Sequence, residues 1–247
     1  LLLKYGFEVT LCSRSEDGTA KCLKGFKNGE LADKLVTTTN FKDLKNCGLL
    51  IESVVEDENI KRQVFREIET IAWEDAIIAS NASSLKISSI SSECKNKKNI
   101  LGMHFFNPVA HTKLVEIAKT DSTSEESVQR ITDLVRNLGK EPIIVKDTPG
   151  FVLNRILFTM LNESANLVYR GIAAKEDIDS AMVNGALHPA GPLKIIDLIG
   201  VDVTVDILKN LQNQLKDSKF APSPILLKML KENRLGRKTK KGFYDYQ

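Results

Sequence analysis

The stretch from residue 80 to residue 116 gathers the side chains best suited to acid–base chemistry. Ser83, His104, Asn107 and Glu116 fall within it, in the segments S-N-A-S-S-L, G-M-H-F-F-N-P-V and K-L-V-E. A histidine can take a proton from a substrate hydroxyl near neutral pH. A carboxylate on its far nitrogen fixes the tautomer and stabilises the imidazolium, and a serine hydroxyl can hold the same substrate oxygen. These groups predict oxidation of an alcohol to a ketone, with a nicotinamide accepting the hydride.

The alternative for His104 is a structural side chain that caps or fills the end of a strand. For a histidine without polar neighbours, that would be the better interpretation. The surrounding H-F-F-N-P and K-L-V-E segments favour the catalytic one.

The composition is that of an ordinary soluble globular protein. The chain has 247 residues, of which 42% are hydrophobic and 27% charged, enough for one large or two modest domains. The net charge of +3 is too small to argue for nucleic acid as a partner. No apolar run approaches the roughly 20 residues of a transmembrane helix, so we expect no membrane partner either.

The cysteines and histidines argue against a metal centre. Cys12, Cys22, Cys47 and Cys94 form no C-x-x-C pair, and the chain has 3 histidines. A structural zinc site is therefore not expected. Dispersed, unpaired cysteines suit a reducing compartment, which favours a cytoplasmic protein.

The chain begins within a recognisable pattern. There is no initiator methionine, and L-L-L-K-Y-G is typical of the end of an amphipathic helix. A strand over 8–13 follows, completing the second half of a βαβ unit. The first half would carry a strand and a G-x-G-x-x-G turn for a pyrophosphate, yet no G-x-G occurs in the chain. We therefore expect that residues are missing upstream of Leu1, and a targeting peptide among them stays open.

Strands and helices alternate over residues 1–146. One amphipathic helix has an apolar stripe from Ile60 to Ile71, and another runs from a capping box at Ser122 or Thr123 to a stop at Gly139. This alternation predicts an α/β domain with a mostly parallel sheet and helices on both faces. The expected strands span 8–13, 35–38, 48–56, 76–80 and 142–145.

Beyond the turn D-T-P-G at 147–150 the pattern becomes all-helical. The sequence therefore divides into a Rossmann-like dinucleotide-binding domain at 1–146, without its first strand and Gly-rich loop, and an all-α domain at 147–247. The helix over 151–170 is apolar on several faces, which favours a homodimer through this domain; burial within one subunit is the alternative. The other expected helices span 175–184, 193–199, 202–215 and 224–233.

The end of the strand at 8–13 bears on the choice of cofactor. An acidic residue there would hold the adenosine ribose of NAD, whereas a basic one suits the additional phosphate of NADP. This strand ends in Ser13-Arg14, and an arginine can bind a phosphate bidentately. NADP is slightly favoured over NAD; a surface arginine beside a turn is the alternative.

The order of the motifs resembles that of the L-3-hydroxyacyl-CoA dehydrogenases, most closely the bacterial 3-hydroxybutyryl-CoA dehydrogenases. The segments that carry this resemblance over 6–246 are S-N-A-S-S-L, G-M-H-F-F-N-P-V, K-L-V-E, D-T-P-G-F-V-L-N-R, E-D-I-D-x-A-M, H-P-x-G-P and G-R-K-x-x-x-G-F-Y-D-Y. It implies a Rossmann domain followed by a helical dimerisation domain. It also implies NAD(P)-dependent interconversion of short-chain (S)-3-hydroxyacyl-CoA, such as 3-hydroxybutyryl-CoA, and 3-oxoacyl-CoA.

The resemblance assigns roles to individual residues. His104 would be the general base in oxidation and the acid in reduction, and Glu116 would orient it. Ser83 would hydrogen-bond the 3-oxygen of the substrate, and Asn154 would help to hold the substrate from the second domain. A site in an interdomain cleft is implied. The residues expected at the cofactor site are Ser13, Arg14, Glu56, Lys61, Ser83, Asn107 and Lys238. We also expect the nearby glutamate to raise the pKa of His104, so that oxidation improves as the pH rises through it.

Several departures from the family leave these residues intact. The segment 15–34, with turn signals at Asp17-Gly18 and Asn28-Gly29 and room for one short helix, is shorter than the family's CoA-binding arm. His111-Thr112, Ala190 and Lys240 replace other residue types. Two alternatives therefore stay open: a related dehydrogenase of another hydroxy acid or CoA ester, and a non-catalytic dimeric relative.

Overall fold

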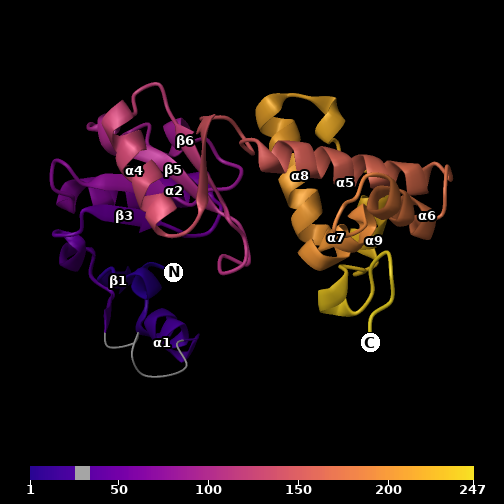
Figure 1. Cartoon of the computed structure of the whole chain (residues 1–247), viewed down its shortest axis with the longest axis horizontal. Coiled ribbons are helices and arrows are strands. Elements are labelled where there is room, and N and C mark those ends of the chain that lie inside the picture. Colours follow the sequence, from indigo (N-terminus) through magenta and orange to yellow (C-terminus); the bar gives the residue numbers. More distant parts are fainter. Residues whose placement is uncertain (26–33) are drawn as a thin grey trace. The chain divides into compact units, whose positions relative to one another are not determined.

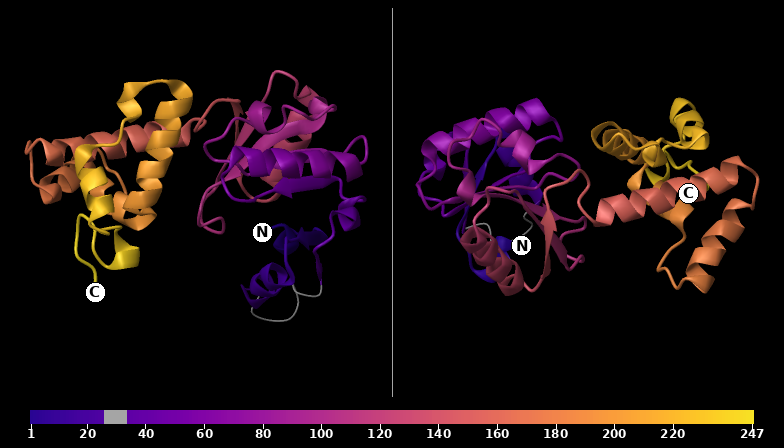
Figure 2. Two further views of the ribbon diagram at one scale, coloured as in Figure 1. Left: turned by 180° about the vertical axis from the view of Figure 1, so that it is seen from behind. Right: turned by 90° about the horizontal axis from the view of Figure 1, so that it is seen from above.

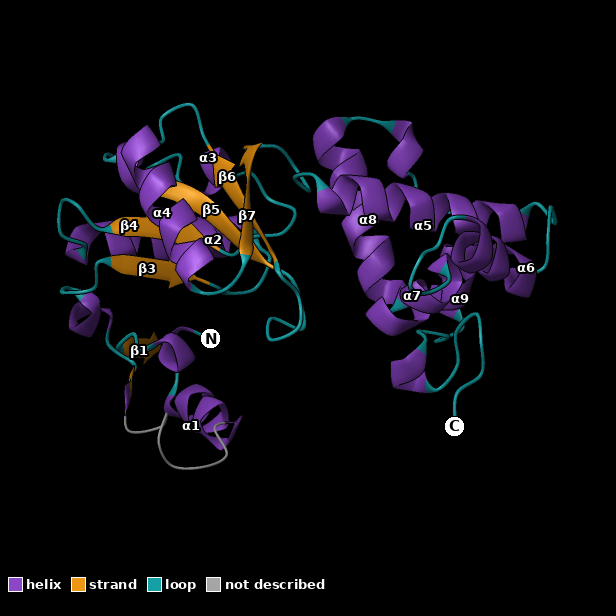
Figure 3. Cartoon of the chain, viewed as in Figure 1, coloured by secondary structure: helices purple, strands orange, loops and turns teal. Residues whose placement is uncertain are grey.

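The computed structural model describes residues 1–25 and 34–247, which form two compact units, Leu1–Phe151 and Val152–Gln247 (Figures 1 and 2). All described strands belong to the first unit, whereas the second is helical (Figure 3). Each unit buries its own apolar core. The sequence predicted a domain boundary at residue 147.

The first unit contains two sheets. The smaller pairs β1 (Val9–Cys12) with β2 (Leu35–Thr38) in parallel. The larger is five-stranded, and its neighbouring strands are parallel except for the antiparallel pair β5 and β6. The described strands are thus mostly parallel, as predicted, but they are divided between two sheets. The strands of the larger sheet, in spatial order, are β3 (Leu49–Glu52), β4 (Ile77–Ser80), β5 (Ile100–Phe105), β6 (Leu114–Lys119) and β7 (Glu141–Lys146).

Helices pack on both faces of the larger sheet. Successive side chains of a strand point to opposite faces of the sheet, so one strand contributes side chains to two cores. Leu50 and Ile78 join the core that includes α2 (Glu58–Ile71) and α3 (Ile87–Ile90). Ile77 belongs to the other core, with α4 (Glu125–Asn137). Apolar strands buried on both sides are typical of a parallel sheet covered by helices.

The start of α4 differs from the prediction. Its N-cap is Ser124, whose hydroxyl accepts the N–H of Ser127 at 3.1 Å. The hydroxyl of Thr123 is buried and donates to the carbonyl of Ile100 at 2.6 Å. The predicted capping box at Ser122 or Thr123 was therefore wrong, because Thr123 instead binds the first residue of β5.

The short helix α1 (Glu16–Gly25) follows β1. It runs through Asp17-Gly18, where the sequence predicted a turn. A Cβ at Gly18 would lie 2.1 Å from the hydroxyl oxygen of Ser13, so any other residue there would require that side chain to move. The other turn signal, Asn28-Gly29, lies outside the described residues.

The second unit is organised around its long first helix, α5. This helix packs against α7, α8 and α9 and buries Phe158 and Leu161 in the shared core. The expected helix over 175–184 is α-helical to Ser180 and continues as a π-helical turn over Ala181–Gly185. The helices are α5 (Leu153–Tyr169), α6 (Lys175–Ser180), α7 (Pro192–Ile199), α8 (Val201–Leu215) and α9 (Pro224–Lys231). Among the helices built from described residues, none has the length and apolar character needed to cross a bilayer.

Two buried aspartates fix the C-terminal segment G-F-Y-D-Y. Asp197 of α7 accepts the N–H groups of Phe243 and Tyr244 at 2.8 and 2.9 Å and the hydroxyl of Tyr246 at 3.0 Å. Asp179 of α6 accepts two N–H groups in the first turn of α7 and the hydroxyl of Tyr244. The segment is thus attached to the helical core through carboxylates.

Candidate active site

Polar side chains gather on one face at one edge of the larger sheet. Glu52 and Ser80 end β3 and β4 and are partners in register. His104 lies near the end of β5, and Glu116 lies opposite it on the antiparallel strand β6. Strand alternation puts these side chains on the α2–α3 face of the sheet. That face is defined by Leu50, Ile78, Ile100 and Ala118. The carboxyl ends of parallel strands are where open α/β sheets bind ligands.

His104 and Glu116 form a directly opposed pair. They are register partners on neighbouring antiparallel strands, a position that holds Cβ atoms about 4.5–5.5 Å apart. Both side chains are buried, with 6% and 0% of their surface exposed. Within the described part of the chain, neither nitrogen of the imidazole has a hydrogen-bond partner of ordinary geometry. The ring is therefore buried next to a carboxylate with its nitrogens available to a ligand.

Burial lowers the pKa of His104 because a desolvated imidazole resists protonation. The backbone carbonyl of Asn81 and the negative charge of Glu56 oppose this effect without outweighing it. The expectation of a raised pKa was therefore wrong in direction. The consequence is an imidazole that is neutral at neutral pH, the form that accepts a proton.

Aromatic rings enclose the imidazole. Phe106 meets it edge-on at a centroid distance of 4.4 Å, and Phe151 lies 6.0 Å away. Asp147, in the D-T-P-G turn that precedes Phe151, accepts the N–H groups of Ile87 and Ser88 at 2.6 and 2.8 Å. These hydrogen bonds attach the turn to the start of α3, which follows the serine-rich loop, residues 81–86.

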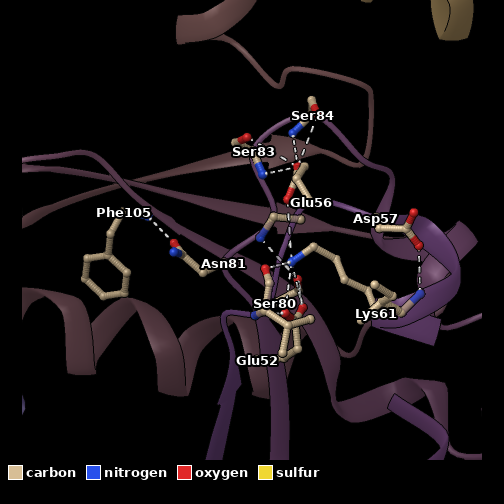
Figure 4. A network of polar contacts seen from close by, with 12 residues as sticks. Glu52, Glu56, Asp57, Lys61, Ser80, Asn81, Ser83, Ser84 and Phe105 are labelled. Carbon is tan, nitrogen blue, oxygen red and sulfur yellow. Dashed lines mark hydrogen bonds and ion pairs between the residues drawn. The ribbon is translucent and has the colours of Figure 1, made fainter. Parts of the chain in front are cut away.

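The loop after β4 places Ser83 (Figure 4). The N–H of Ser83 donates to Oε1 of Glu56 at 2.8 Å, and its hydroxyl lies 3.3 Å from the same oxygen. The side chain of Asn81 accepts the N–H of Phe105 at 2.9 Å, which ties this loop to the residue after His104. The loop is thus attached to both neighbouring strand ends, β3 through Glu56 and β5 through Asn81.

Glu56 and Lys61, both predicted at the cofactor site, differ in exposure. The side chain of Glu56 is 30% exposed, whereas that of Lys61 is 1% exposed beneath it. Burial acts to raise the pKa of Glu56, but the N–H groups of Ser83 and Ser84 and the charge of Lys61 lower it further than burial raises it. Glu56 is therefore a carboxylate at neutral pH.

The remaining predicted cofactor residues of the first unit lie at other strand ends. Ser13 directly follows β1 and donates its N–H to the carbonyl of Thr38 at 3.0 Å. Arg14 is exposed, so its guanidinium is accessible to an anion. Asn107 is also exposed; it lies after β5 and precedes Pro108 through a cis peptide bond.

Asn154 and Lys238 belong to the second unit. Asn154 lies in α5 and is 7% exposed. Lys238 is exposed and pairs with the carboxylate of Asp202 at the start of α8. Among the predicted residues, the structure therefore groups Glu56, Lys61, Ser83, His104 and Glu116 in the first unit.

Sequence reasoning missed several groups of this site. Glu52, Ser80, Asn81 and Asp147 all hydrogen-bond within it. One signal was available: an acidic residue inside the apolar run L-L-I-E needs a buried partner. The partners themselves depend on pairing between distant strands, which local patterns do not specify.

A mostly parallel α/β sheet with polar groups at one edge, joined to an all-helical unit, is the architecture of a two-domain dehydrogenase. Residues 1–148 match the family model of the 3-hydroxyacyl-CoA dehydrogenase NAD binding domain, and residues 150–246 match that of the C-terminal domain. The chain therefore belongs to the 3-hydroxyacyl-CoA dehydrogenase family, as the motif order predicted.

Individual relatives agree over nearly the whole chain. The 3-hydroxybutyryl-CoA dehydrogenase of Clostridioides difficile is 43% identical, over 98% of this chain and 92% of the relative. The mitochondrial hydroxyacyl-coenzyme A dehydrogenase of Homo sapiens is 37% identical, over 98% and 84%. The crystal structure of (S)-3-hydroxybutyryl-CoA dehydrogenase from Ralstonia eutropha superposes with a TM-score of 0.89 at 33% identity, covering 99% of this chain and 92% of that one.

Proposed function

We propose that this protein is an NAD(P)-dependent dehydrogenase that interconverts short-chain (S)-3-hydroxyacyl-CoA and 3-oxoacyl-CoA, such as 3-hydroxybutyryl-CoA and acetoacetyl-CoA. The observation that carries the proposal is the opposed pair of His104 and Glu116, buried and with the imidazole nitrogens unoccupied. Family membership supplies the reaction class. A buried base beside a carboxylate suits removal of a hydroxyl proton.

In the oxidation direction, neutral His104 accepts the proton of the 3-hydroxyl while Ser83 donates a hydrogen bond to the same oxygen. When bound, the nicotinamide supplies the hydride acceptor. Glu116 stabilises the imidazolium that forms, which offsets the effect of burial on the charged ring. In the reverse direction the imidazolium returns its proton to the 3-oxygen of the ketone.

The residues that we propose for the cofactor fit a dinucleotide. Ser13 and Arg14 follow β1, Glu56 and Ser83 lie beyond β3 and β4, and the carboxyl ends of parallel strands are the usual dinucleotide edge. Exposed Arg14 suits the additional phosphate of NADP, which makes NADP the slightly favoured cofactor. Asn107 and Lys238 complete the proposed cofactor site, and Asn154 joins Ser83 in holding the acyl-CoA substrate. Lys61 was also expected at the cofactor, but its side chain is 1% exposed and its ammonium is bound to Glu52 and the carbonyl of Val54, so we leave it out of the site.

We also propose a homodimer formed through the helical unit. Its surface keeps large apolar side chains in solvent: Ile156 is 66% exposed, Ile172 68%, Leu187 85% and Leu198 62%. Large apolar side chains left in solvent are what an interface with a second copy would cover. Sedimentation equilibrium of the protein should give twice the monomer mass; a monomer at micromolar concentration would contradict this part.

The test of the function is oxidation of NADH and of NADPH, side by side, with acetoacetyl-CoA. Turnover is the expected result, and the ratio of the two cofactors reports on Arg14. Cofactor binding without turnover would favour a dehydrogenase of another hydroxy acid or CoA ester. Neither turnover nor binding would favour a non-catalytic relative.

A further inference from the structure

The carboxylate of Glu52 is buried next to the proposed site. Glu52 is 3% exposed at the end of β3. Its Oε1 accepts the N–H of Val54 at 2.5 Å, and its Oε2 accepts the hydroxyl of Ser80 at 2.6 Å. The hydroxyl of Ser80 in turn accepts the N–H of Ala82 at 3.1 Å. Glu52 therefore connects the end of β3 to the first turn of the serine-rich loop.

The ammonium group of Lys61 is bound entirely within this region. It lies 2.9 and 3.1 Å from the carboxylate oxygens of Glu52 and 3.2 Å from the carbonyl of Val54. Oε2 of Glu56 is 3.5 Å away. With 1% of its side chain exposed, Lys61 has neither the access nor spare donors for a bound cofactor.

Glu56 faces the pair on one side and the loop on the other (Figure 4). Its Oε2 faces Lys61, while its Oε1 accepts the N–H of Ser83 at 2.8 Å and that of Ser84 at 2.7 Å. The serine hydroxyls lie near the same oxygen, at 3.3 and 3.1 Å. The position of Glu56 thus determines where the backbone of Ser83 lies.

A contribution to folding stability does not by itself explain why this ion pair is buried here. Burying an ion pair removes two charges from water, and well-packed apolar side chains often stabilise a core equally well. Apolar side chains could not reproduce one feature of this arrangement. The ammonium of Lys61 lies close to the carboxylate of Glu52 and farther from that of Glu56. Glu56 then keeps an oxygen for the N–H groups of the serines.

We propose that Glu52 is a positioning residue: by binding Lys61 it keeps that ammonium from drawing Glu56 off the backbone of Ser83 and Ser84, and so fixes the Ser83 hydroxyl for the substrate oxygen. The proposal rests on the proposed function for its last step. Without the charge of Glu52, Lys61 turns to Glu56, its remaining carboxylate neighbour, and draws it away from the serines. The buried pair therefore acts on the reaction without touching substrate or cofactor.

The first test is hydrogen–deuterium exchange of the peptide over residues 81–86 in the full-length protein, comparing wild type with Glu52→Gln. Glutamine preserves the shape and removes the charge. Exchange at this peptide should become faster in E52Q, while a peptide from α4 keeps its rate. The double variant E52Q/K61M, in which nothing competes for Glu56, should regain the slow exchange of the wild type.

The second test is steady-state reduction of acetoacetyl-CoA. E52Q should lose about 10- to 100-fold in kcat, the size expected when a catalytic group is displaced by roughly 1 Å. E52Q/K61M should recover at least part of that loss. The matched control is Arg66→Met, which changes another residue of α2. It removes an exposed ion pair in which Nη1 of Arg66 lies 2.9 Å from Oε2 of Glu93. It should change neither exchange nor kcat.

Several outcomes would overturn the proposal. Unchanged exchange at 81–86 in E52Q would do so, and so would a double variant no better than the single one. If E52Q does not fold, Ser80→Ala removes one of the Glu52 hydrogen bonds; unchanged exchange there would also overturn it. Hydrogen–deuterium exchange needs no substrate, so it tests the network even if the protein does not turn over acetoacetyl-CoA. Absence of turnover would contradict only the proposed function.

Discussion

Two buried polar side chains, one from each unit, differ in how their hydrogen-bonding capacity is used. In the helical unit, Asp197 is 1% exposed, and backbone N–H groups and a tyrosine hydroxyl occupy its carboxylate. In the α/β unit, His104 is 6% exposed, yet in the described chain neither of its nitrogens has a hydrogen-bond partner of ordinary geometry. Burying a polar group without a partner is unfavourable, so the imidazole persists because the surrounding fold holds it.

The difference separates structural from chemical polar groups. A carboxylate whose acceptor sites are filled by its own chain has no capacity left for a ligand, and its removal should affect folding. An imidazole with free nitrogens has that capacity, and its removal should affect the reaction. Each variant below should therefore change one property far more than the other.

The largest expected effect is that of His104→Ala on turnover. We expect kcat with acetoacetyl-CoA to fall by at least ~100-fold, the size of a lost general acid–base group. Cofactor affinity and the urea midpoint should change little, since within the described protein the ring makes no hydrogen bond of ordinary geometry. Steady-state kinetics, cofactor titration and urea denaturation measure the three quantities. A loss of tenfold or less would remove His104 from this role.

The converse variant is Asp197→Ala. We expect the free energy of unfolding to fall by about 3 kcal/mol, because buried N–H donors lose a charged acceptor. Urea denaturation followed by circular dichroism measures it. Tyr246→Phe is the matched control: it removes one of these hydrogen bonds and should lower the free energy of unfolding by about 1 kcal/mol. If the two variants lowered the free energy of unfolding by the same amount, the structural role of Asp197 would be contradicted.

A smaller effect is expected from Arg14→Ala. If the exposed guanidinium binds the additional phosphate of NADP, its loss should weaken NADPH by about tenfold and NADH hardly at all. Fluorescence titration of both cofactors measures the ratio. Equal weakening of the two would show that Arg14 does not distinguish them.

The smallest effect concerns pH. Burial lowers the pKa of His104 below the ordinary value of 6.5, so the oxidation rate should fall only at pH values below that. The negative charge of Glu56 favours the imidazolium and partly opposes burial. Glu56→Gln removes this charge, so the pKa should drop further and the acidic limb of the oxidation profile should move to lower pH. A shift to higher pH would contradict this assignment of the charges.

Local patterns predicted most helices and several strands of the fold, but they missed the strands β5 and β6 and said little about strand pairing. The strand over 35–38 has the predicted bounds, and the apolar stripe from Ile60 to Ile71 lies within α2. Periodicity carries this information because each element must bury one face. The division into two sheets and the antiparallel β5–β6 pair were not predicted, since both depend on contacts between segments distant in sequence.

The candidate site divides in the same way. Motif order singled out His104, Glu116 and Ser83, whose residue types reveal their chemistry. The link from Glu52 through Lys61 to the serine-rich loop was not predicted, because the sequence around a charged residue in a strand does not specify which residue it pairs with. The direction of the His104 pKa was also mispredicted: the sequence reveals a neighbouring carboxylate but not the depth of burial that outweighs it.

The hydrogen bonds of Asp147 have a consequence for the order of events during synthesis. Ile87 precedes its acceptor by 60 residues, and Ser88 by 59. A nascent chain that has left the ribosome only as far as β6 therefore carries the serine-rich loop and His104 but cannot yet anchor the start of α3. The site should become rigid only after β7 and the D-T-P-G turn emerge, so its completion coincides with the completion of the whole α/β unit.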